Sequence, residues 1–568
     1  KSTDRRVKLV RRLLHADAYS PKGANGAPLT TRVDDGTGKL KTVPVVFNYR
    51  EEFAENWAEL WTVWLMSRSG HNDYRDQMRV WLHQKFSQDM NHKDFVTKLL
   101  TATGQVGGTK PASGWVFKED YAANYLVHHL GDPVKDDKET EVNERTRDGA
   151  FDAVPVTSRT TKLFLGLQTQ CTQCHDHPFN KEWVQSDFWG VNAFFRQTVR
   201  SATPSGPPIG NNAAKMANAT PVTLTDDAEL NPGMIALYER RDGRKIGSFP
   251  IMLKDYDAAI NGQKSTKMLM TAPSGKSRRT QLAEWVVGHD NFGKAYVNRV
   301  WAHLFGRGLN KEPTADDFGS NNEIVHPELL TYLGEQFVNY GHNQKQLLEW
   351  ICTSDVYSLS HVAKKEYTDI KYDPYFARMP LKAMSPEVLF ESLMTATTPR
   401  KLSKAAKEAR IAAKDAWMRK LVRQFGDDEG NELSFNGTIV QALLMMNGKE
   451  LNNEIGVGRT GETQNIVKEL MGKNGGAAGK MYDDLFLMTV SRHPTPAEIV
   501  RLEEVRTGKA TVTLGSPTPA PAKGKGPTPK ATPAPTVFAP GAVIGKEHEF
   551  YQDVLWALLN TNEFMINH

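Results

Sequence analysis

Hydrophobic residues recur every three to four positions along most of this chain, which is the period of an amphipathic helix. Stripes of this kind predict helices in the segments 1–20, 49–66, 74–88, 121–129, 297–309, 344–356 and 551–560. In the second of these segments, Trp57, Trp61 and Trp64 fall on one helix face. An aromatic stripe at this spacing is more often core than ligand site. We therefore expect the three rings inside the protein.

The composition changes between residues 198 and 271, where Gly, Pro, Asn and Thr increase and the helical period ends. Short alternating pieces at 221–225 and 245–249 predict strands, and the Gly-rich residues 104–115 predict an irregular loop. These patterns predict a mainly α, multi-helical two-domain protein with a small β-rich insert between the helical halves. The expected division is a helical domain at 1–200, a β-rich insert at 201–275, and a helical C-terminal domain at 276–568 that contains a Pro/Ala/Lys-rich loop at 509–541.

Length and composition narrow the class of protein. The 568 residues exceed one ordinary core, and 39% hydrophobic with 24% charged residues is typical of a soluble globular protein. No apolar run approaches the roughly 18–20 residues of a membrane span, so we expect none. Net charge is +5, and the basic clusters at 240–245 and 276–279 lack interleaved aromatics. We interpret them as solvated surface and expect no nucleic-acid binding.

Two of the three cysteines stand beside a histidine in the sequence Cys171-Thr-Gln-Cys174-His175. This is the attachment signature of haem c, in which both thiols add to porphyrin vinyl groups and the histidine is the proximal iron ligand. Leu163 and Leu167 precede it at helical spacing, so we expect the motif at the end of a helix. The chain starts at Lys1 rather than Met, which indicates a processed precursor or a trimmed chain. Because haem c is attached outside the cytoplasmic membrane, the motif predicts an exported protein, either periplasmic or extracellular at the cell surface.

The same spacing has other interpretations, because C-x-x-C also occurs in local disulfides, thioredoxin-like redox pairs and zinc sites. A second C-x-x-C is absent from the sequence. A non-haem centre would therefore use the four ligands Cys171, Cys174, His175 and His177, around zinc, copper or non-haem iron. Such a protein is either structural or a hydrolase of extracellular polymers. A third alternative is a surface-assembly scaffold in which the motif is only structural.

Several residues elsewhere in the sequence bear on these alternatives. Trp183, Phe188, Trp189 and 194–195 flank the motif and would form the apolar wall that a haem needs. Candidates for a sixth iron ligand are Met216, Met234 and Met252, although methionines are more often packing residues. A hydrolase would draw on Asp316, Asp317 or His326, although helix capping explains the Asp pair equally well.

The polar face of the segment 297–309 carries Arg299 and His303 one helical turn apart, and we interpret them as a surface hydrogen-bonded pair. Gly306 follows the last apolar position and is expected to end that helix.

Several motifs in both halves of the chain point to one family. They are Phe164-Leu-Gly-Leu-Gln, Cys171-Thr-Gln-Cys-His-Asp-His-Pro-Phe179, Asp187-Phe-Trp-Gly190, Val297-Asn-Arg-Val-Trp-Ala-His303, Phe305-Gly-Arg-Gly-Leu309, Asp317-Phe-Gly319 and His326-Pro-Glu-Leu-Leu330. Together they resemble the planctomycete cytochrome-c-like family, a group of large secreted two-domain proteins of uncharacterised function. The resemblance implies an exported bacterial protein with an N-terminal cytochrome-like half and a C-terminal helical half. It implies no substrate, and whether the protein is an enzyme stays open; the haem c interpretation of the motif adds a redox partner protein.

Overall fold

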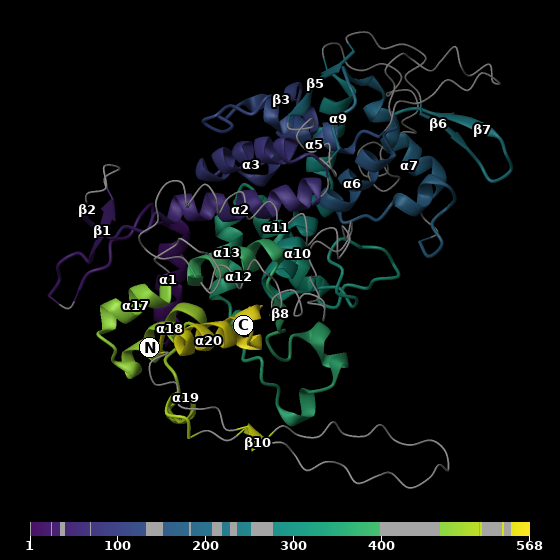
Figure 1. The fold of residues 1–568 in the computed structure, drawn as a ribbon. Helices are drawn as coiled ribbons and strands as arrows, with labels where there is room; N and C mark the ends of the chain where they lie inside the picture. The colour runs from purple at the N-terminus through teal and green to yellow at the C-terminus, as the bar shows by residue number, and fades with distance from the viewer. Residues whose placement is uncertain are drawn as a thin grey trace, which may run out of the picture. The chain divides into compact units, whose positions relative to one another are not determined.

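The fold is known from a computed structural model, and its contacts divide the chain into two compact units, with the boundary between Leu381 and Lys382 (Figure 1). Each unit is considered by itself. The structure describes residues 2–23, 25–34, 40–68, 70–131, 152–180, 183–206, 218–227, 236–251, 276–397, 466–509, 512–513, 537–538 and 547–567.

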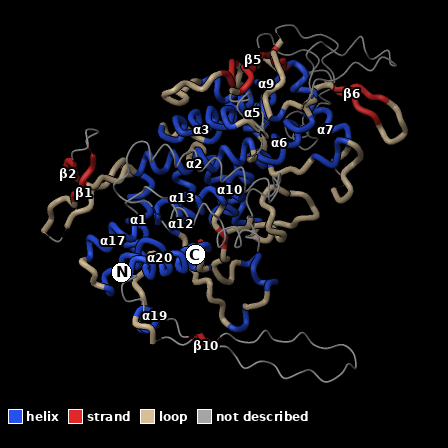
Figure 2. Tube along the Cα trace, viewed as in Figure 1, coloured by secondary structure: helices blue, strands red, loops and turns tan. Residues whose placement is uncertain are grey.

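Unit 1 is mainly helical, and Figure 2 shows its short strands at the margins of the helices. Its helices are α1 (Ser2–His15), α2 (Tyr49–Met66), α3 (Asn72–Ser87), α4 (His92–Thr101), α5 (Asn124–His129), α6 (Val154–Leu165), α7 (Gln185–Asn192), α9 (Arg278–Gly288), α10 (Asn291–Phe305), α11 (Pro327–Asn339) and α12 (Gln344–Thr353). Its strands are β1 (Thr30–Asp34), β2 (Leu40–Pro44), β3 (Gly104–Gly108), β4 (Thr198–Arg200), β5 (Ala219–Asp226), β6 (Ala236–Glu239) and β7 (Lys245–Ser248).

Local capping sets where several of these helices begin. The side chains of Asn48 and Asn91 accept backbone N–H groups at the starts of α2 and α4, and Ser277 does the same for α9. Each satisfies a donor that lacks a partner within the helix. Helix α10 ends at Gly306, which has the left-handed φ of 78°. The sequence prediction for that helix end is confirmed.

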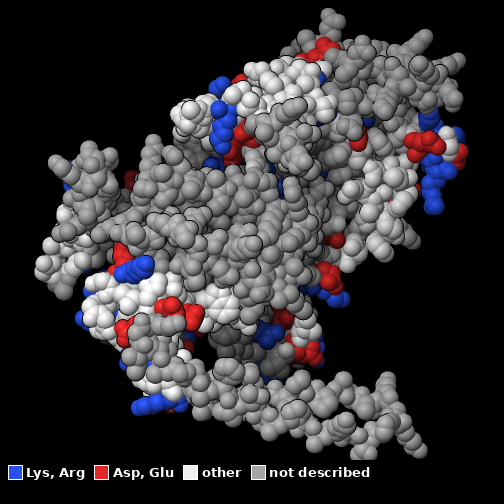
Figure 3. All heavy atoms as spheres, viewed as in Figure 1, with Lys and Arg blue, Asp and Glu red and all other residues white. Residues whose placement is uncertain are grey.

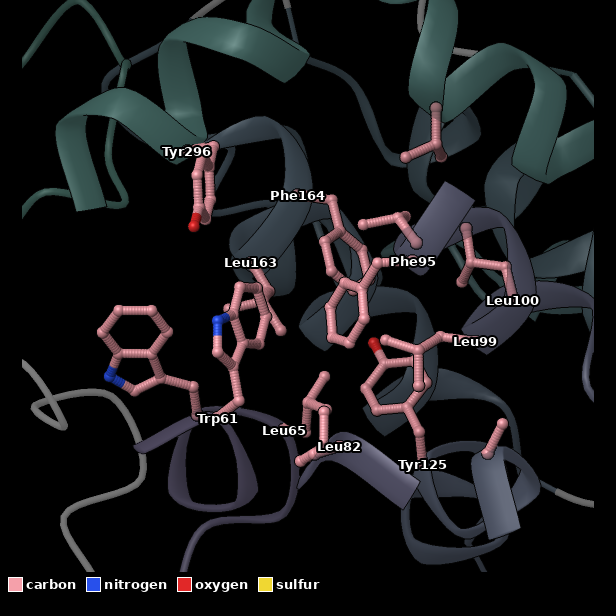
Figure 4. Close-up of a cluster of buried hydrophobic side chains, with 14 of the residues drawn as sticks. Trp61, Leu65, Leu82, Phe95, Leu99, Leu100, Tyr125, Leu163, Phe164 and Tyr296 are labelled. Atoms are coloured by element: carbon pink, nitrogen blue, oxygen red, sulfur yellow. The ribbon is translucent and has the colours of Figure 1, made fainter. Parts of the chain in front are cut away.

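The hydrophobic core of unit 1 contains side chains from helices that precede the Gly-rich residues 104–115 and from helices that follow them. Trp57, Trp61 and Trp64 are buried, as the aromatic stripe predicts. The Trp61 ring stacks on Tyr296 of α10, with ring centroids 6.1 Å apart. Tyr125 of α5 and Phe164 of α6 belong to the cluster drawn in Figure 4, and their rings meet edge to face with centroids 6.0 Å apart. Segments more than 200 positions apart in sequence therefore share one hydrophobic core.

A three-stranded antiparallel sheet has the order β3-β5-β4. Strand β3 lies within the segment expected to be an irregular loop, and that expectation is wrong for 104–108. The segment shows no alternation because three of its five residues are glycine. One of them, Gly107, has φ +78°, and a Cβ there would lie 2.2 Å from the carbonyl oxygen of Thr220. Glycine is therefore required for this strand to approach β5.

Unit 2 has its own buried cluster, formed largely by α17, α18 and α20. Thr495 and Glu498 form a capping box at the start of α19. Of the loop at 509–541, the structure describes only Lys509 and two short strands that pair with each other. The elements of unit 2 are β8 (Lys382–Ala383), α13 (Pro386–Thr397), α17 (Ile466–Asn474), α18 (Ala478–Thr489), α19 (Pro496–Arg506), β9 (Val512–Thr513), β10 (Val537–Phe538), α20 (Glu547–Leu559), α21 (Asn562–Met565) and β11 (Ile566–Asn567).

The fold class is confirmed: the protein is mostly helical, with small antiparallel sheets between about residues 104 and 248. Within the described part of the chain, no helix combines the length and apolar character needed to cross a membrane. The predicted boundaries at residues 200 and 275 stay a prediction.

Candidate functional site

The two motif cysteines lie in a separate turn rather than at the end of a helix. Helix α6 stops at Leu165, and Gly166 follows with φ +66°. A Cβ on Gly166 would lie 2.9 Å from the ring of Phe318, so only glycine fits between the helix end and that ring. The motif begins later, in the 3₁₀ helix Gln170–Gln173. The prediction of a helix end is wrong because α6 already stops at Leu165, and the 3₁₀ helix that carries Cys171 begins at Gln170.

Both thiols face outward from this segment, which we call the Cys–His turn (residues 170–177). Cys171 and Cys174 are exposed and unbonded to each other. In a 3₁₀ helix, residues three apart lie on the same side. Thr172, between the cysteines, is buried, and its hydroxyl donates to the carbonyl of Thr169 at 2.6 Å. The turn is therefore anchored through Thr172 while its sulfur atoms stay accessible.

His175 is exposed, and its Nδ1 lies 2.7 Å from the carbonyl oxygen of Asp176. A carbonyl oxygen only accepts hydrogen bonds, so Nδ1 carries the proton and Nε2 keeps its lone pair. Metal-bound histidines commonly have this arrangement, in which the second ring nitrogen donates to a carbonyl or carboxylate. In the neutral ring, Nε2 of His175 is therefore the nitrogen whose lone pair is available to a metal ion.

His177 has a different environment from His175. Its ring is buried, and its Nδ1 accepts backbone N–H groups from Phe179 at 3.2 Å and from Asn180 at 2.9 Å. Burial lowers the pKa of His177, while the nearby Asp317 carboxylate raises it. A neutral ring that accepts at Nδ1 carries its proton on Nε2. The His177 side chain therefore stabilises the backbone turn at residues 177–180 by accepting two of its N–H groups.

Helix α7 also supports the Cys–His turn, through hydrogen bonds that its residues donate to the turn. The carbonyl oxygen of Gln173 accepts hydrogen bonds from the Gln185 side chain at 3.1 Å and from the Trp189 indole at 3.0 Å. The backbone N–H of Gln185 donates to the Asp176 carboxylate at 2.9 Å. Gln173, which precedes Cys174, and Asp176, which follows His175, are therefore both held by residues of α7.

The predicted aromatic wall is only partly at this site. Trp183 is half-buried and its ring lies 5.3 Å from that of His177. Phe179 is 69% exposed, and its ring lies 6.2 Å from that of His177. Phe188 and the pair 194–195 are buried in the interior. The three candidate methionines, Met216, Met234 and Met252, lie outside the described residues.

The three residues proposed for a hydrolase, Asp316, Asp317 and His326, each have a different contact in the structure. Asp316 is buried in an ion pair with Arg299, with 2.6 Å between Oδ2 and Nη2. Arg299 is 2% exposed, so the predicted surface pair of Arg299 and His303 is wrong. Asp317 accepts the backbone N–H of Gly319, and His326 lies against the carbonyl of Pro374.

No group of three or more His, Cys, Asp and Glu side chains is arranged to hold a metal ion among the residues that the structure describes. The four-ligand centre of Cys171, Cys174, His175 and His177 stays a prediction.

Two family models match this chain. Residues 41–200 match PSCyt2, a protein of unknown function (DUF1549), and residues 278–506 match PSD1, a protein of unknown function (DUF1553). The chain belongs to the planctomycete cytochrome-like two-domain family. The resemblance found in the sequence is thereby confirmed. Neither a curated protein nor a solved structure matches the chain.

In this family member the two matched segments meet at the Cys–His turn. Asn180, next to the turn, accepts hydrogen bonds from the backbone N–H of Ser320 at 2.6 Å and from the Ser320 hydroxyl, and its amide donates to Asn321 at 3.2 Å. The backbone N–H of Phe318 donates to the carbonyl of Gly166 at 2.8 Å. A loop of the PSD1 segment therefore contacts the chain on both sides of the Cys–His turn, at Gly166 before it and at Asn180 after it.

The sequence did not point to these supporting residues. Asn180, Ser320 and Gln185 act through backbone groups of residues that are distant in the chain, and no local spacing encodes such contacts. One signal was available, the polar and Gly-containing run Asp317-Phe-Gly-Ser-Asn-Asn322, which is typical of a tight loop.

Proposed function

We propose that this protein is an exported haem c protein that transfers electrons or supports a redox step outside the cytoplasmic membrane. The observation that carries the proposal is the His175 ring, whose Nδ1 is committed to the Asp176 carbonyl beside two exposed thiols. A thiol pair three residues apart and a histidine with a free Nε2 are the donors that haem c attachment uses. The family's description as cytochrome-like agrees with this proposal and leaves the function itself unknown.

The residues of the turn would have distinct tasks. Cys171 and Cys174 would each hold haem through one thioether bond, formed when the thiol S–H adds across a vinyl group and its proton goes to the neighbouring vinyl carbon. His175 Nε2 would bind the iron. When bound, haem supplies one-electron iron chemistry.

Residues around the turn would orient the donors and exclude water. Gln185 and Trp189 hold the Gln173 carbonyl, which lies between the two attachment points. The exposed Phe179 ring offers an apolar surface that a planar macrocycle would cover. Removing that ring from water contributes favourably to holding the group.

Export is part of the same proposal. Haem c attachment takes place outside the cytoplasmic membrane, so a protein that carries it is expected in the periplasm or at the cell surface. Three cysteines, all free in this structure, leave the two motif thiols available for attachment.

Intact-mass spectrometry of the full chain, produced with its export signal and a haem c maturation system, tests the proposal. We expect one covalent haem adduct, absent from Cys171→Ala/Cys174→Ala. Cys352→Ala is the matched control and should keep the adduct, because Cys352 is partly buried with a pKa raised by burial to about 11. An unmodified mass for the parent chain, or loss of the adduct only in Cys352→Ala, would overturn the proposal.

A further inference from the structure

A basic hairpin stands next to the Cys–His turn. Strands β6 and β7 pair with Tyr238 opposite Ile246 and Glu239 opposite Lys245. Their connection is closed by two backbone hydrogen bonds, from Arg240 to Arg244 at 2.9 Å and from Gly243 to Arg240 at 2.8 Å. The hairpin lies beside α7 in Figure 1. Its tip therefore has a defined backbone.

The base of this hairpin is bonded to the same groups that support the motif. The Gln185 amide donates both to the Gln173 carbonyl at 3.1 Å and to the Glu239 carbonyl at 2.9 Å. The Tyr238 ring stacks on Trp189, with centroids 5.6 Å apart and planes 3° apart. Since Trp189 also donates to Gln173, the hairpin and the Cys–His turn are fixed to one another.

The tip is rich in cationic side chains. Arg240 and Arg241 are exposed, and Arg244 is engaged by Asp242 at 2.5 Å. In Figure 3 basic and acidic side chains gather at this hairpin, on the right of the view. The basic residues outnumber the acidic ones between positions 239 and 245. Exposed charges of one sign near a reactive site attract partners of the opposite sign and raise association rates.

We infer that the Arg240–Arg241 tip docks an acidic face of a redox partner protein beside the Cys–His turn. This inference rests on the proposed haem c function and names the kind of partner for that site. A partner that binds Arg240 and Arg241 is brought to the turn because the hairpin base is bonded to Gln173. The sequence alone gave no reason to separate this cluster from ordinary solvated surface.

The shape of the tip favours a protein over an acidic polysaccharide. Sugar binding usually employs an exposed aromatic face, and the Tyr238 ring is 9% exposed and covered by Trp189. A projecting hairpin presents its arginines to a broad surface. Arginine also pairs in bidentate fashion with carboxylates, the charged groups of an acidic protein face.

The first test measures binding of a fluorescent oligoglutamate peptide to the full chain by anisotropy at low salt, and it needs no haem. Arg240→Glu/Arg241→Glu should weaken binding roughly tenfold. The control Lys22→Glu/Lys41→Glu changes net charge equally at exposed sites on and next to the β1–β2 hairpin of the same unit, and should change binding by less than about twofold. Equal weakening by both pairs, or no weakening by the arginine pair, would overturn the inference.

The second test uses the haem-loaded protein, whose spectrum reports separately on the proposed function. Reduction by anionic ferrocyanide should be slowed roughly tenfold in Arg240→Glu/Arg241→Glu, and reduction by cationic hexaammineruthenium(II) should be accelerated. Unchanged rates in a protein with a normal haem spectrum would contradict the inference alone. Tighter binding of dextran sulfate than of oligoglutamate, without effect on electron exchange, would assign the tip to a polysaccharide instead.

Discussion

At the scale of single residues, two histidines of one motif have opposite hydrogen-bond roles. His175 Nδ1 donates to a carbonyl, whereas His177 Nδ1 accepts two backbone N–H groups. The sequence places both within three positions of Cys174 and cannot separate them, because the difference depends on how the backbone turns. In the structure His175 is exposed and His177 is buried, and the role of His175 as an iron ligand stays a prediction.

Removing the two side chains should therefore have different consequences for stability. His177→Ala leaves two backbone donors without their acceptor and should lower the free energy of unfolding by about 1–3 kcal/mol. His175→Ala removes an exposed ring and should change it by less than about 0.5 kcal/mol. Urea denaturation of both variants measures this difference. Equal effects would contradict the structural role assigned to His177.

Gly166 illustrates a second residue-scale constraint. Gly166→Ala combines a left-handed φ of +66° with a clash against the Phe318 ring. Gly114→Ala is the matched control, since Gly114 has φ +85° and open space around the added Cβ. The backbone alone should cost about 1–2 kcal/mol in both variants. We expect Gly166→Ala to lower the melting temperature more than Gly114→Ala does. Equal melting temperatures would show that the Phe318 ring moves aside to accommodate the added methyl group.

At the scale of elements, periodicity predicted the helices well, because each buries one apolar face. Strand β3 escaped prediction because its sequence Gly-Gln-Val-Gly-Gly has no alternation, and its partner β5 lies more than 100 positions later. Pairing of that kind is set by tertiary contacts rather than by local pattern. The buried ion pairs were missed for the same reason, since Arg299 stands on a face that looks polar in sequence.

One buried ion pair joins three elements and should be energetically important. Arg279 of α9 is 0% exposed, bonds Asp226 of β5 at 2.7 Å and donates to the carbonyl of Ala102, after α4. Asp226→Ala leaves this guanidinium buried without its carboxylate and should destabilise unit 1 by about 3–5 kcal/mol.

Glu55→Ala is the comparison for this prediction, because it removes an exposed pair with Arg79 and should cost about 0–1 kcal/mol. Denaturant titration followed by tryptophan fluorescence measures both. A loss below about 1 kcal/mol in Asp226→Ala would mean that water or another anion replaces the carboxylate.

At the scale of the whole molecule, each unit has its own core, and the matched family segments both contribute to unit 1. The Cys–His turn draws its supports from positions as far apart as Gln185 and Ser320. The sequence could identify the motif but not this support, which exists only once the two segments are packed together.

Buried histidines make stability depend on pH. Burial lowers the pKa of His92 and of His129 well below the ordinary value. The unfolded chain, whose histidines titrate near about 6.5, then binds more protons than the folded chain below that pH, so stability falls on acidification. Between pH 7.5 and 5.5 we expect the free energy of unfolding of unit 1, measured by urea denaturation, to decrease by up to about 1.4 kcal/mol per pH unit for each histidine.

His129→Gln should flatten this pH dependence, since a glutamine amide can donate to the Leu65 carbonyl as the His129 ring does and has no charge to gain. His361→Gln, at an exposed position, is the control and should leave the slope in place. A slope unchanged in His129→Gln would place the acid sensitivity elsewhere.

The central claim is that Cys171, Cys174 and His175 hold haem c, and the reduced-minus-oxidised visible spectrum in alkaline pyridine tests it most directly. The parent protein should be purified from its native host, alongside Cys171→Ala/Cys174→Ala. We expect a c-type α-band in the parent protein and none in the variant. A featureless spectrum from the parent protein would contradict the claim, and elemental analysis would then decide whether the Cys–His turn holds another metal.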